Sequence, residues 1–132
     1  MQTRTRVAAI IIQDKKLLMV QGGFPELWTP GGKLQEGETE EECLRRELKE
    51  EIWVEITNLS FFKEYRWVSF YNPEIPLVQK IYIVSIAWGI KPDAEIESFV
   101  RLSREEFEQK RFTMIRWDQE EIIPDLIKEN IF

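Results

Sequence analysis

Three glutamates, Glu47, Glu50 and Glu51, stand at a spacing that could place them around a metal ion. At i, i+3 and i+4 they would share one helical face, in the last turns, where the helix dipole disfavours negative charge. Carboxylate oxygens bind Mg²⁺, and a bound cation can activate water for attack on phosphorus. Exposed like charges cost only about 0.2–0.5 kcal/mol per helix pair, so a solvated acidic face is the alternative on spacing alone.

The glutamates require a helix whose remaining surface packs on a core. Thr39 followed by Glu42 predicts a capping box at the start of this helix. Leu44, Leu48 and Ile52 recur every four residues and predict a buried apolar stripe. The stripe should pack on a sheet and turn the acidic face toward a cleft.

Strand-like segments surround this helix, and a loop rich in glycine and proline, residues 21–32, leads toward it. Ser103 with Glu106 predicts a capping box for a second helix, and Asp118 with Glu121 repeats the pattern before a final one. The order of elements predicts an α/β fold, a mixed β-sheet with helices on both faces. The expected strands are Val7–Ile12, Leu17–Val20, Phe61–Tyr71, Leu77–Trp88 and Phe99–Leu102.

The bulk properties exclude several classes of protein. The 132 residues suit one domain over 1–132, and no segment is long and apolar enough to span a membrane. A net charge of −6 argues against a nucleic-acid polymer as partner, and the absence of histidine removes His-based catalysis and Cys/His zinc sites. The single cysteine, Cys43, excludes an internal disulfide and indicates a cytoplasmic protein; we expect its side chain to be buried.

Residues 32–54 resemble the signature of the Nudix hydrolase family, the MutT-like pyrophosphohydrolases. The segment matches eight positions within 23 residues and departs at Trp53, where the family has a glycine. The resemblance implies a Nudix-type α/β/α sandwich and hydrolysis of a nucleoside diphosphate linked to a group X, with Mg²⁺ as cofactor and Mn²⁺ as a substitute. The matching residues are Gly32, Glu38, Arg46, Glu47, Leu48, Glu50, Glu51 and Val54.

The resemblance also implies roles for the residues of the site. Glu47, Glu50 and Glu51 would be the metal ligands and the catalytic carboxylates. The carbonyl of Gly31 would be a further ligand to the metal. Arg46 would join the catalytic set by orienting the glutamates.

Other acidic residues are expected to assist. Glu38 would hold the loop against the helix. Glu95 or Glu97 would add a metal ligand from a later loop; the alternative is that these residues are only a run of charges exposed to solvent. Trp53 either bears a left-handed conformation, which costs an ordinary residue about 1–2 kcal/mol, or the helix ends differently. In the second case Glu51 is the ligand most at risk.

Substrate contacts are expected from the loops and aromatic residues around the helix. The short chain favours a nucleoside triphosphate, cleaved to a monophosphate and pyrophosphate. The pair Trp117–Asp118 resembles residues of relatives that bind oxidised purines, with an acidic side chain on the purine edge. The expected substrate-binding residues are Gly32, Lys33, Arg6, Trp28, Trp117 and Asp118, and further candidates for stacking on a base are Trp67, Tyr71 and Trp88.

Two alternatives remain open from the sequence. Trp53 favours a Nudix-fold module that binds nucleotides, or regulates through them, with little or no catalysis. If the signature is a coincidence, the chain is an acidic α/β interaction domain. For the enzyme we expect a small nucleotide as partner and a monomer or homodimer, with no membrane attachment.

Overall fold

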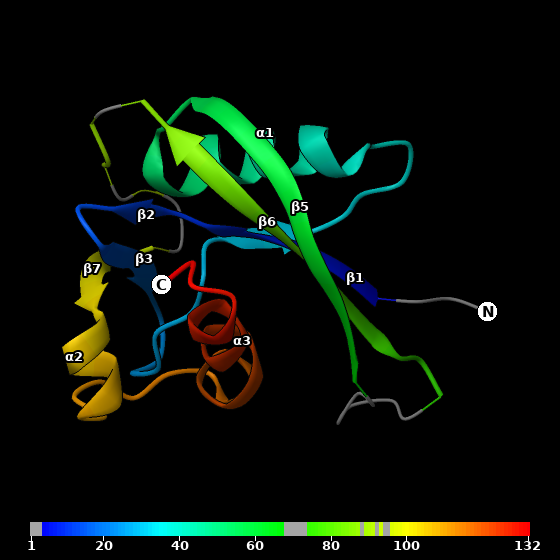
Figure 1. Ribbon diagram of the computed structural model, residues 1–132. Helices are drawn as coiled ribbons and strands as arrows, with labels where there is room; N and C mark the ends of the chain where they lie inside the picture. Colours follow the sequence, from blue (N-terminus) through cyan, green and yellow to red (C-terminus); the bar gives the residue numbers. More distant parts are fainter. Residues whose placement is uncertain (1–3, 68–73, 88, 92, 94–95) are drawn as a thin grey trace.

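The computed structural model describes residues 4–67, 74–87, 89–91, 93 and 96–132. Its larger sheet has four strands in the order β4-β1-β6-β5 (Figure 1). The inner strand β1 (Arg4–Ile10) pairs in parallel with β6 (Leu77–Ile86) and antiparallel with β4 (Gly31–Lys33). Because β5 (Ile56–Trp67) is antiparallel to β6, the sheet is mixed, as the sequence predicted.

A smaller antiparallel sheet joins β2 (Ile12–Gln13), β3 (Lys16–Gln21) and β7 (Ser98–Ser103) in this order. The single strand predicted over Val7–Ile12 is therefore wrong in its extent. The strand is interrupted at Ile11, whose side chain is buried in the core under α1 while the chain passes from the larger sheet to the smaller. Sequence periodicity does not reveal this break, because buried residues occupy both sides of it.

The two long strands also differ from their predicted extents. β5 begins at Ile56 rather than Phe61, because Ile56 is already buried in the core and paired with Ile86. β6 ends at Ile86. The predicted ends of these strands, Tyr71 and Trp88, lie outside the described residues.

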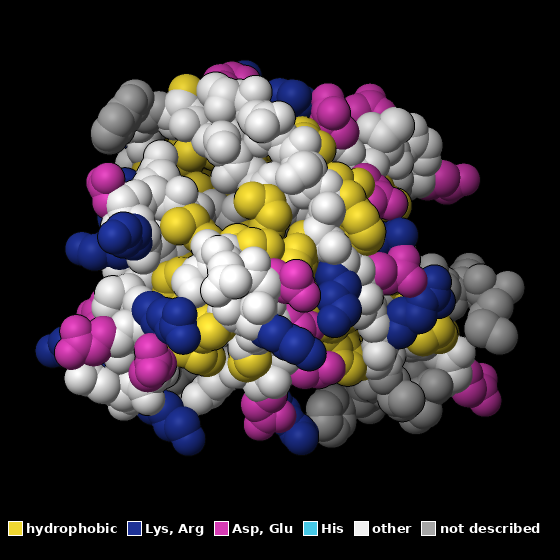
Figure 2. Space-filling model, viewed as in Figure 1, with side chains coloured by type: hydrophobic (Ala, Val, Ile, Leu, Met, Phe, Trp, Pro, Cys, Tyr) yellow, Lys and Arg dark blue, Asp and Glu magenta, His cyan; other side chains and the backbone are white. Residues whose placement is uncertain are grey.

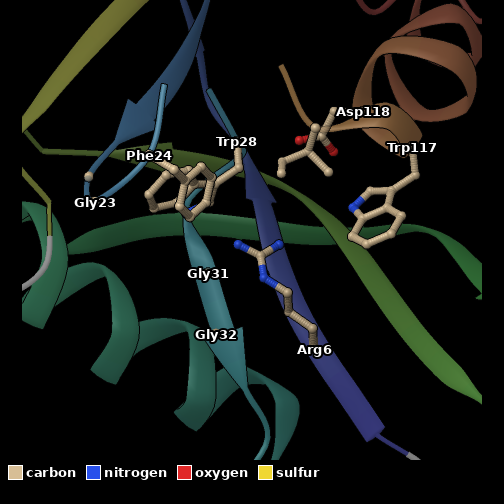
Figure 3. A pocket seen from close by; sticks show the side chains of 10 residues that line it. Arg6, Gly23, Phe24, Trp28, Gly31, Gly32, Trp117 and Asp118 are labelled. Atoms are coloured by element: carbon tan, nitrogen blue, oxygen red, sulfur yellow. The ribbon is translucent and has the colours of Figure 1, made fainter. Parts of the chain in front are cut away.

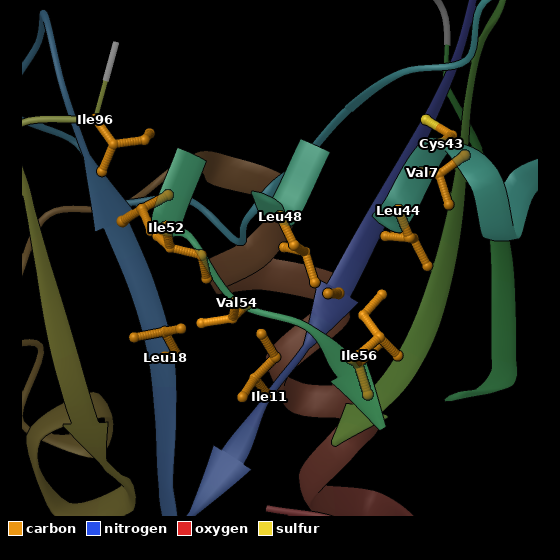
Figure 4. Close-up of a cluster of buried hydrophobic side chains, with 13 residues drawn as sticks. Val7, Ile11, Leu18, Cys43, Leu44, Leu48, Ile52, Val54, Ile56 and Ile96 are labelled. Atoms are coloured by element: carbon orange, nitrogen blue, oxygen red, sulfur yellow. The ribbon is translucent and has the colours of Figure 1, made fainter. Parts of the chain in front are cut away.

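Helix α1 (Glu40–Ile52) covers one face of the larger sheet (Figure 1). The predicted capping box is confirmed: Thr39 Oγ1 accepts from the Glu42 amide at 3.1 Å, and Glu42 Oε1 accepts from the Thr39 amide at 3.0 Å. The predicted stripe is fully buried and points into the core shown in Figure 4. This stripe comprises Leu44, Leu48 and Ile52, with Cys43 buried beside them as expected.

The C-terminal residues cover the opposite face. A π-helical turn, η1 (Asp118–Ile122), runs directly into α3 (Ile123–Lys128). The short helix α2 (Arg104–Glu108) follows β7 and begins with the predicted capping box of Ser103 and Glu106. Helices on both faces confirm the predicted sandwich. The second core, between η1, α3 and the sheets, includes Ala8, Ile10, Ile81, Ile122, Ile123 and Leu126.

The capping box predicted from Asp118 and Glu121 is wrong. The residue that precedes η1 is Trp117, and it makes no capping hydrogen bond with its side chain. Asp118 lies inside the turn, and its Oδ2 accepts a hydrogen bond from the amide of Thr29 at 3.3 Å. A partner distant in sequence thus replaces the local one, which spacing alone cannot reveal.

The surface mixes both signs of charge. On the face shown in Figure 2, acidic and basic side chains are interspersed around hydrophobic side chains near the centre. The net charge of −6 is therefore not gathered in one patch on this face. Within the described part of the chain, no helix has the length and apolar character needed to cross a membrane.

Candidate functional site

Two glutamates of α1 lie over the glycines of β4. Glu51 is buried, and its Oε1 accepts a hydrogen bond from the amide of Gly31 at 3.1 Å. A Cβ atom on Gly32 would lie 2.2 Å from Cδ of Glu47, so any other residue there would displace this carboxylate. A Cβ on Gly31 would lie 2.2 Å from the carbonyl oxygen of Val7. The glycines thus first serve the packing of β4 between β1 and α1.

Arg46 connects the loop before α1 to the acidic face of the helix. Its guanidinium donates to both carboxylate oxygens of Glu38, at 2.7 and 3.0 Å, and to Oε1 of Glu47 at 2.7 Å. The same group lies 3.6 Å from Oε2 of Glu50. Hydrogen bonding to Arg46 lowers the pKa of Glu38 to about 2 and raises the pKa of Arg46. This geometry supports the expected role of Arg46 in orienting the glutamates, and that of Glu38 in holding the loop.

The three glutamates do not have equal environments. Glu47 and Glu51 face β4, whereas the side chain of Glu50 is 56% exposed. Among the described residues, no three acidic, cysteine or histidine side chains lie close enough together to hold a metal ion. The structure thus brings two of the three predicted ligands onto the glycine strand and leaves the third near its rim.

The donor set of this region fits a hard cation. Every predicted ligand is an oxygen atom, from the three carboxylates and the carbonyl of Gly31, and such sets suit Mg²⁺ or Mn²⁺. The nearby thiol of Cys43 is buried, which raises its pKa to about 12, so no thiolate competes for a softer metal. Glu95, a further predicted ligand, lies outside the described residues.

A cavity of about 510 Å³ opens beside the same glycines. Figure 3 shows Trp28 on one side, Trp117 and Asp118 on the other, and Arg6 of β1 between them. Five predicted substrate-binding residues therefore line one cavity. The sixth, Lys33, lies outside it and lines a hollow of about 180 Å³ with Arg4 and Arg6. The lining of the main cavity comprises Arg6, Gly22, Gly23, Phe24, Trp28, Gly31, Gly32, Ile115, Trp117 and Asp118.

Polar groups gather at one wall of the cavity. Asp118 is 1% exposed; Oδ2 accepts from the Thr29 amide, whereas Oδ1 has no hydrogen-bond partner among the described residues. Burial raises the pKa of Asp118 to about 6, although Arg6 and the Thr29 amide act in the opposite direction. Arg6 donates to the Thr29 carbonyl at 2.6 Å. The wall thus offers a buried carboxyl oxygen and a guanidinium from adjacent elements.

Aromatic rings form the sides of the cavity. Phe24 stacks on Trp28 with ring centroids 4.8 Å apart, and Trp117 stacks on Trp67 at 5.2 Å. The sequence analysis missed Phe24, as well as Gly22, Gly23 and Ile115. The available signal was the position of Phe24 between Gly23 and Pro25, since an aromatic residue in such a loop has no strand or helix face on which to be buried.

A model of the NUDIX domain matches residues 2–126 of the chain. The chain belongs to the Nudix family. It is 46% identical over 48 residues to an 8-oxo-dGTP diphosphatase of Proteus vulgaris, a match that covers 36% of this chain and 41% of that protein. The chain thus spans about two fifths of the length of this curated relative.

Solved structures show the same fold. The MutT protein of Methanosarcina mazei Go1 superposes with a TM-score of 0.82 over 98% of this chain and 96% of its own, at 16% identity. The ORF135 protein of E. coli superposes with a TM-score of 0.75 over 90% of this chain and 85% of its own, at 22% identity. These likenesses confirm the Nudix fold predicted from the sequence.

At Trp53, where the chain departs from the Nudix signature, the residue bears a left-handed backbone conformation and the helix does not end differently. Trp53 follows α1 in the left-handed conformation, with φ 60° and ψ 37°, and its amide donates to the carbonyl of Lys49. The helix keeps its exit, and the carboxylate of Glu51 still reaches Gly31. The displacement of Glu51 that a different helix end would cause is therefore not seen.

Glu97, the second acidic candidate of the later Nudix loop, lies at the cavity. Its Oε1 accepts a hydrogen bond from the amide of Gly23 at 3.3 Å. This contact ties Glu97 to the cavity loop rather than to the glutamates of α1. A supporting position at the rim fits this geometry better than a metal ligand.

Proposed function

We propose that this Nudix protein hydrolyses a nucleoside triphosphate to a nucleoside monophosphate and pyrophosphate. The observation that carries the proposal is the shared position of Gly31 and Gly32. These glycines line the aromatic cavity and also lie under the carboxylates of Glu47 and Glu51. A base in the cavity would therefore place its phosphates beside the acidic face of α1.

The residues of α1 would supply the chemistry of hydrolysis. Bound Mg²⁺ would neutralise phosphate charge and lower the pKa of the attacking water. Glu47, Glu50 and Glu51, with the carbonyl of Gly31, would hold this cation, and one of the carboxylates would accept the proton of the water. Arg46, which contacts Glu47 and lies near Glu50, would keep the glutamates oriented.

The cavity supports a purine nucleotide as substrate. Trp28 and Trp117 offer faces for stacking, and the free Oδ1 of Asp118 can pair with N–H groups on the edge of a purine. Arg6 and Lys33 are cations that can contact phosphate oxygens. The partial similarity to an 8-oxo-dGTP diphosphatase supports an oxidised purine nucleotide in particular.

The decisive experiment incubates the purified protein with Mg²⁺ and a panel of nucleoside triphosphates, oxidised purine nucleotides, nucleotide sugars and dinucleotides. We expect release of pyrophosphate from a purine triphosphate, and product analysis would identify the cleaved bond. Failure to cleave any member of the panel with Mg²⁺ or Mn²⁺ would refute the enzyme.

A binding or regulatory module is the second candidate, and one observation favours it. Arg46 already contacts Glu47 and lies near Glu50, so its guanidinium compensates part of the negative charge of these carboxylates. Calorimetry that detects nucleotide binding without turnover would establish this candidate. Robust turnover would exclude it.

We also propose that residues 1–132 form one domain that acts in the cytoplasm as a monomer or homodimer, without a nucleic-acid polymer as partner. The match of the family model to residues 2–126 supports the single domain. The net charge of −6 supports the absence of nucleic acid from its partners. Light scattering with and without nucleotide would settle the oligomeric state.

A further inference from the structure

Trp53 combines an unfavourable backbone conformation with an exposed ring. It occupies the left-handed region at φ 60°, and 58% of its surface is exposed. Neither property is explained by burial in a core. Its indole Nε1 instead donates to Oδ2 of Asp93 at 2.5 Å, and Nζ of Lys91 lies 5.8 Å from the ring centroid. The side chain is therefore engaged by Lys91 and Asp93, which lie between β6 and β7.

The same two residues cap the C-terminal end of α1. The amide of Lys91 donates to the carbonyl of Ile52, and the amide of Asp93 donates to the carbonyl of Glu51, both at 2.8 Å. Carbonyls in the last turn of a helix have no partner within the helix, so these bonds satisfy groups that would otherwise need water. The contact of Trp53 with Asp93 adds a side-chain bond to this backbone cap.

Beyond Asp93, the chain reaches the cavity. Ile96 is buried in the core under α1, and its amide donates to the Asp93 carbonyl at 3.0 Å. The Glu97 amide then donates to the carbonyl of Gln21 at 2.8 Å, while its carboxylate accepts from Gly23 of the cavity lining. A short series of contacts therefore connects the exit of α1 to the glycine loop of the cavity.

We propose that Trp53 is a positioning residue, which ties Lys91 and Asp93, in the segment between β6 and β7, to the exit of α1 and so fixes Gly23 at the cavity. In this role it sets the affinity for the ligand in the cavity, not the rate of the chemical step. Its effect on nucleotides rests on the proposed function, whereas its effect on the segment does not. A glycine at this position would adopt the left-handed conformation freely, whereas Trp53 adopts it with the support of the hydrogen bond to Asp93.

Three substitutions separate the parts of this role. Trp53→Gly relieves the backbone and removes the ring. Trp53→Phe keeps the ring near Lys91 and removes the N–H donor, and Asp93→Ala removes the acceptor. Phe61→Ala is the matched control, since Phe61 is likewise exposed, at 53%, and its ring contacts are to Tyr82 and Lys80 of β6 rather than to Lys91 or Asp93.

The first readout is amide hydrogen exchange at Lys91, Asp93, Glu97 and Gly23. Loss of one hydrogen bond should raise exchange at Lys91 and Asp93 about tenfold in Trp53→Gly, Trp53→Phe and Asp93→Ala, with a smaller rise at Gly23. The control should leave all four amides within about twofold of the parent protein. Unchanged exchange in Trp53→Gly would overturn the proposal even if the protein proves to have no nucleotide activity.

The second readout is binding of an α,β-methylene dGTP analogue by calorimetry, together with turnover of dGTP. We expect the dissociation constant and KM to rise about three- to tenfold in Trp53→Gly, with kcat within about twofold of the parent protein. Faster exchange at Lys91 with unchanged affinity would overturn the positioning role and leave a purely structural one. A parent protein that neither binds nor cleaves the nucleotide would refute the proposed function. The exchange experiment would still test whether Trp53 holds Lys91 and Asp93 at the exit of α1.

Discussion

Asp118 is a buried carboxylic acid at the wall of the cavity, with one oxygen bonded to the Thr29 amide and the guanidinium of Arg6 nearby. Its burial raises its pKa to about 6, so the group exchanges its proton close to neutral pH. An ionised carboxylate only accepts hydrogen bonds, whereas a protonated one also donates. Recognition of a purine edge by Asp118 should therefore depend on pH in a range where purine bases themselves change little.

Asp118→Asn tests this dependence in binding. We expect KM of the parent protein to change across about pH 6, and this inflection to be absent from the Asn variant, because an amide does not ionise. The measurement is KM for a purine triphosphate between about pH 5 and about pH 8. An identical profile in both proteins would show that Asp118 does not read the base.

The same substitution has a predictable effect on stability. The folded pKa of about 6 exceeds the ordinary value of 3.8, so the stability of the parent protein falls as pH rises between these values. Asn removes this penalty, and urea unfolding near pH 7.5 should give a free energy higher by about 1–3 kcal/mol. The difference should shrink near pH 4, below the folded pKa; a difference independent of pH would contradict the buried charge.

The glutamates of α1 give a third prediction at this scale. Glu50→Gln and Glu51→Gln should each lower kcat by about 10²- to 10⁴-fold, because both carboxylates are proposed ligands and an amide is a weaker donor. Both variants should remain folded, since Gln at position 51 can still accept from Gly31. Glu55→Gln is the matched control, an exposed glutamate just beyond the helix. Unchanged turnover in both site variants would refute the assigned roles.

Strand β4 fits between β1 and α1 because its first two residues are glycines. Gly32→Ala would place a methyl group 2.2 Å from Cδ of Glu47 and displace this carboxylate from Arg46. We expect a loss of about 1–3 kcal/mol in unfolding free energy and a weaker affinity for Mg²⁺. The double variant Gly32→Ala/Glu47→Asp, with a shorter acid, should recover part of the stability. Additive losses in chemical denaturation would show that the two residues do not interact.

The elements differ in how far the sequence predicts them. Helix α1 follows from local signals, because Thr39, Glu42 and the apolar stripe act within one segment. The break at Ile11 and the position of Asp118 depend on partners distant in sequence, so local patterns gave a continuous strand and a false capping box. Trp117 and Asp118 were expected at the substrate from the family resemblance, whereas Trp28 was expected there as an aromatic residue and Arg6 as a cation. That they line one cavity depends on the folded chain, and Phe24 was missed because no such signal pointed to it.

The molecule as a whole should be more stable when its metal site is filled. A ligand that binds only the folded state adds RT ln(1 + [L]/Kd), or about 2.7 kcal/mol at a hundredfold excess over Kd. Thermal unfolding with Mg²⁺ should therefore shift to higher temperature, and Glu51→Gln should lose most of this shift. Because the chain carries a net charge of −6, NaCl of equal ionic strength is the necessary control. Equal shifts in the two salts would indicate screening alone.

The parallel pairing of β1 with β6 has a consequence for the synthesis of the protein. Arg4 pairs with Leu77, so β1 must wait for a strand that is made much later. Until β6 emerges, β1 keeps an open edge of unpaired backbone groups, to which other chains can add. Early in translation, β4 and the stripe of α1 are the partners that can shield it. Because β1 depends on a distant strand, we expect the chain to benefit from chaperones during its synthesis. A fragment that stops before β6 should express poorly.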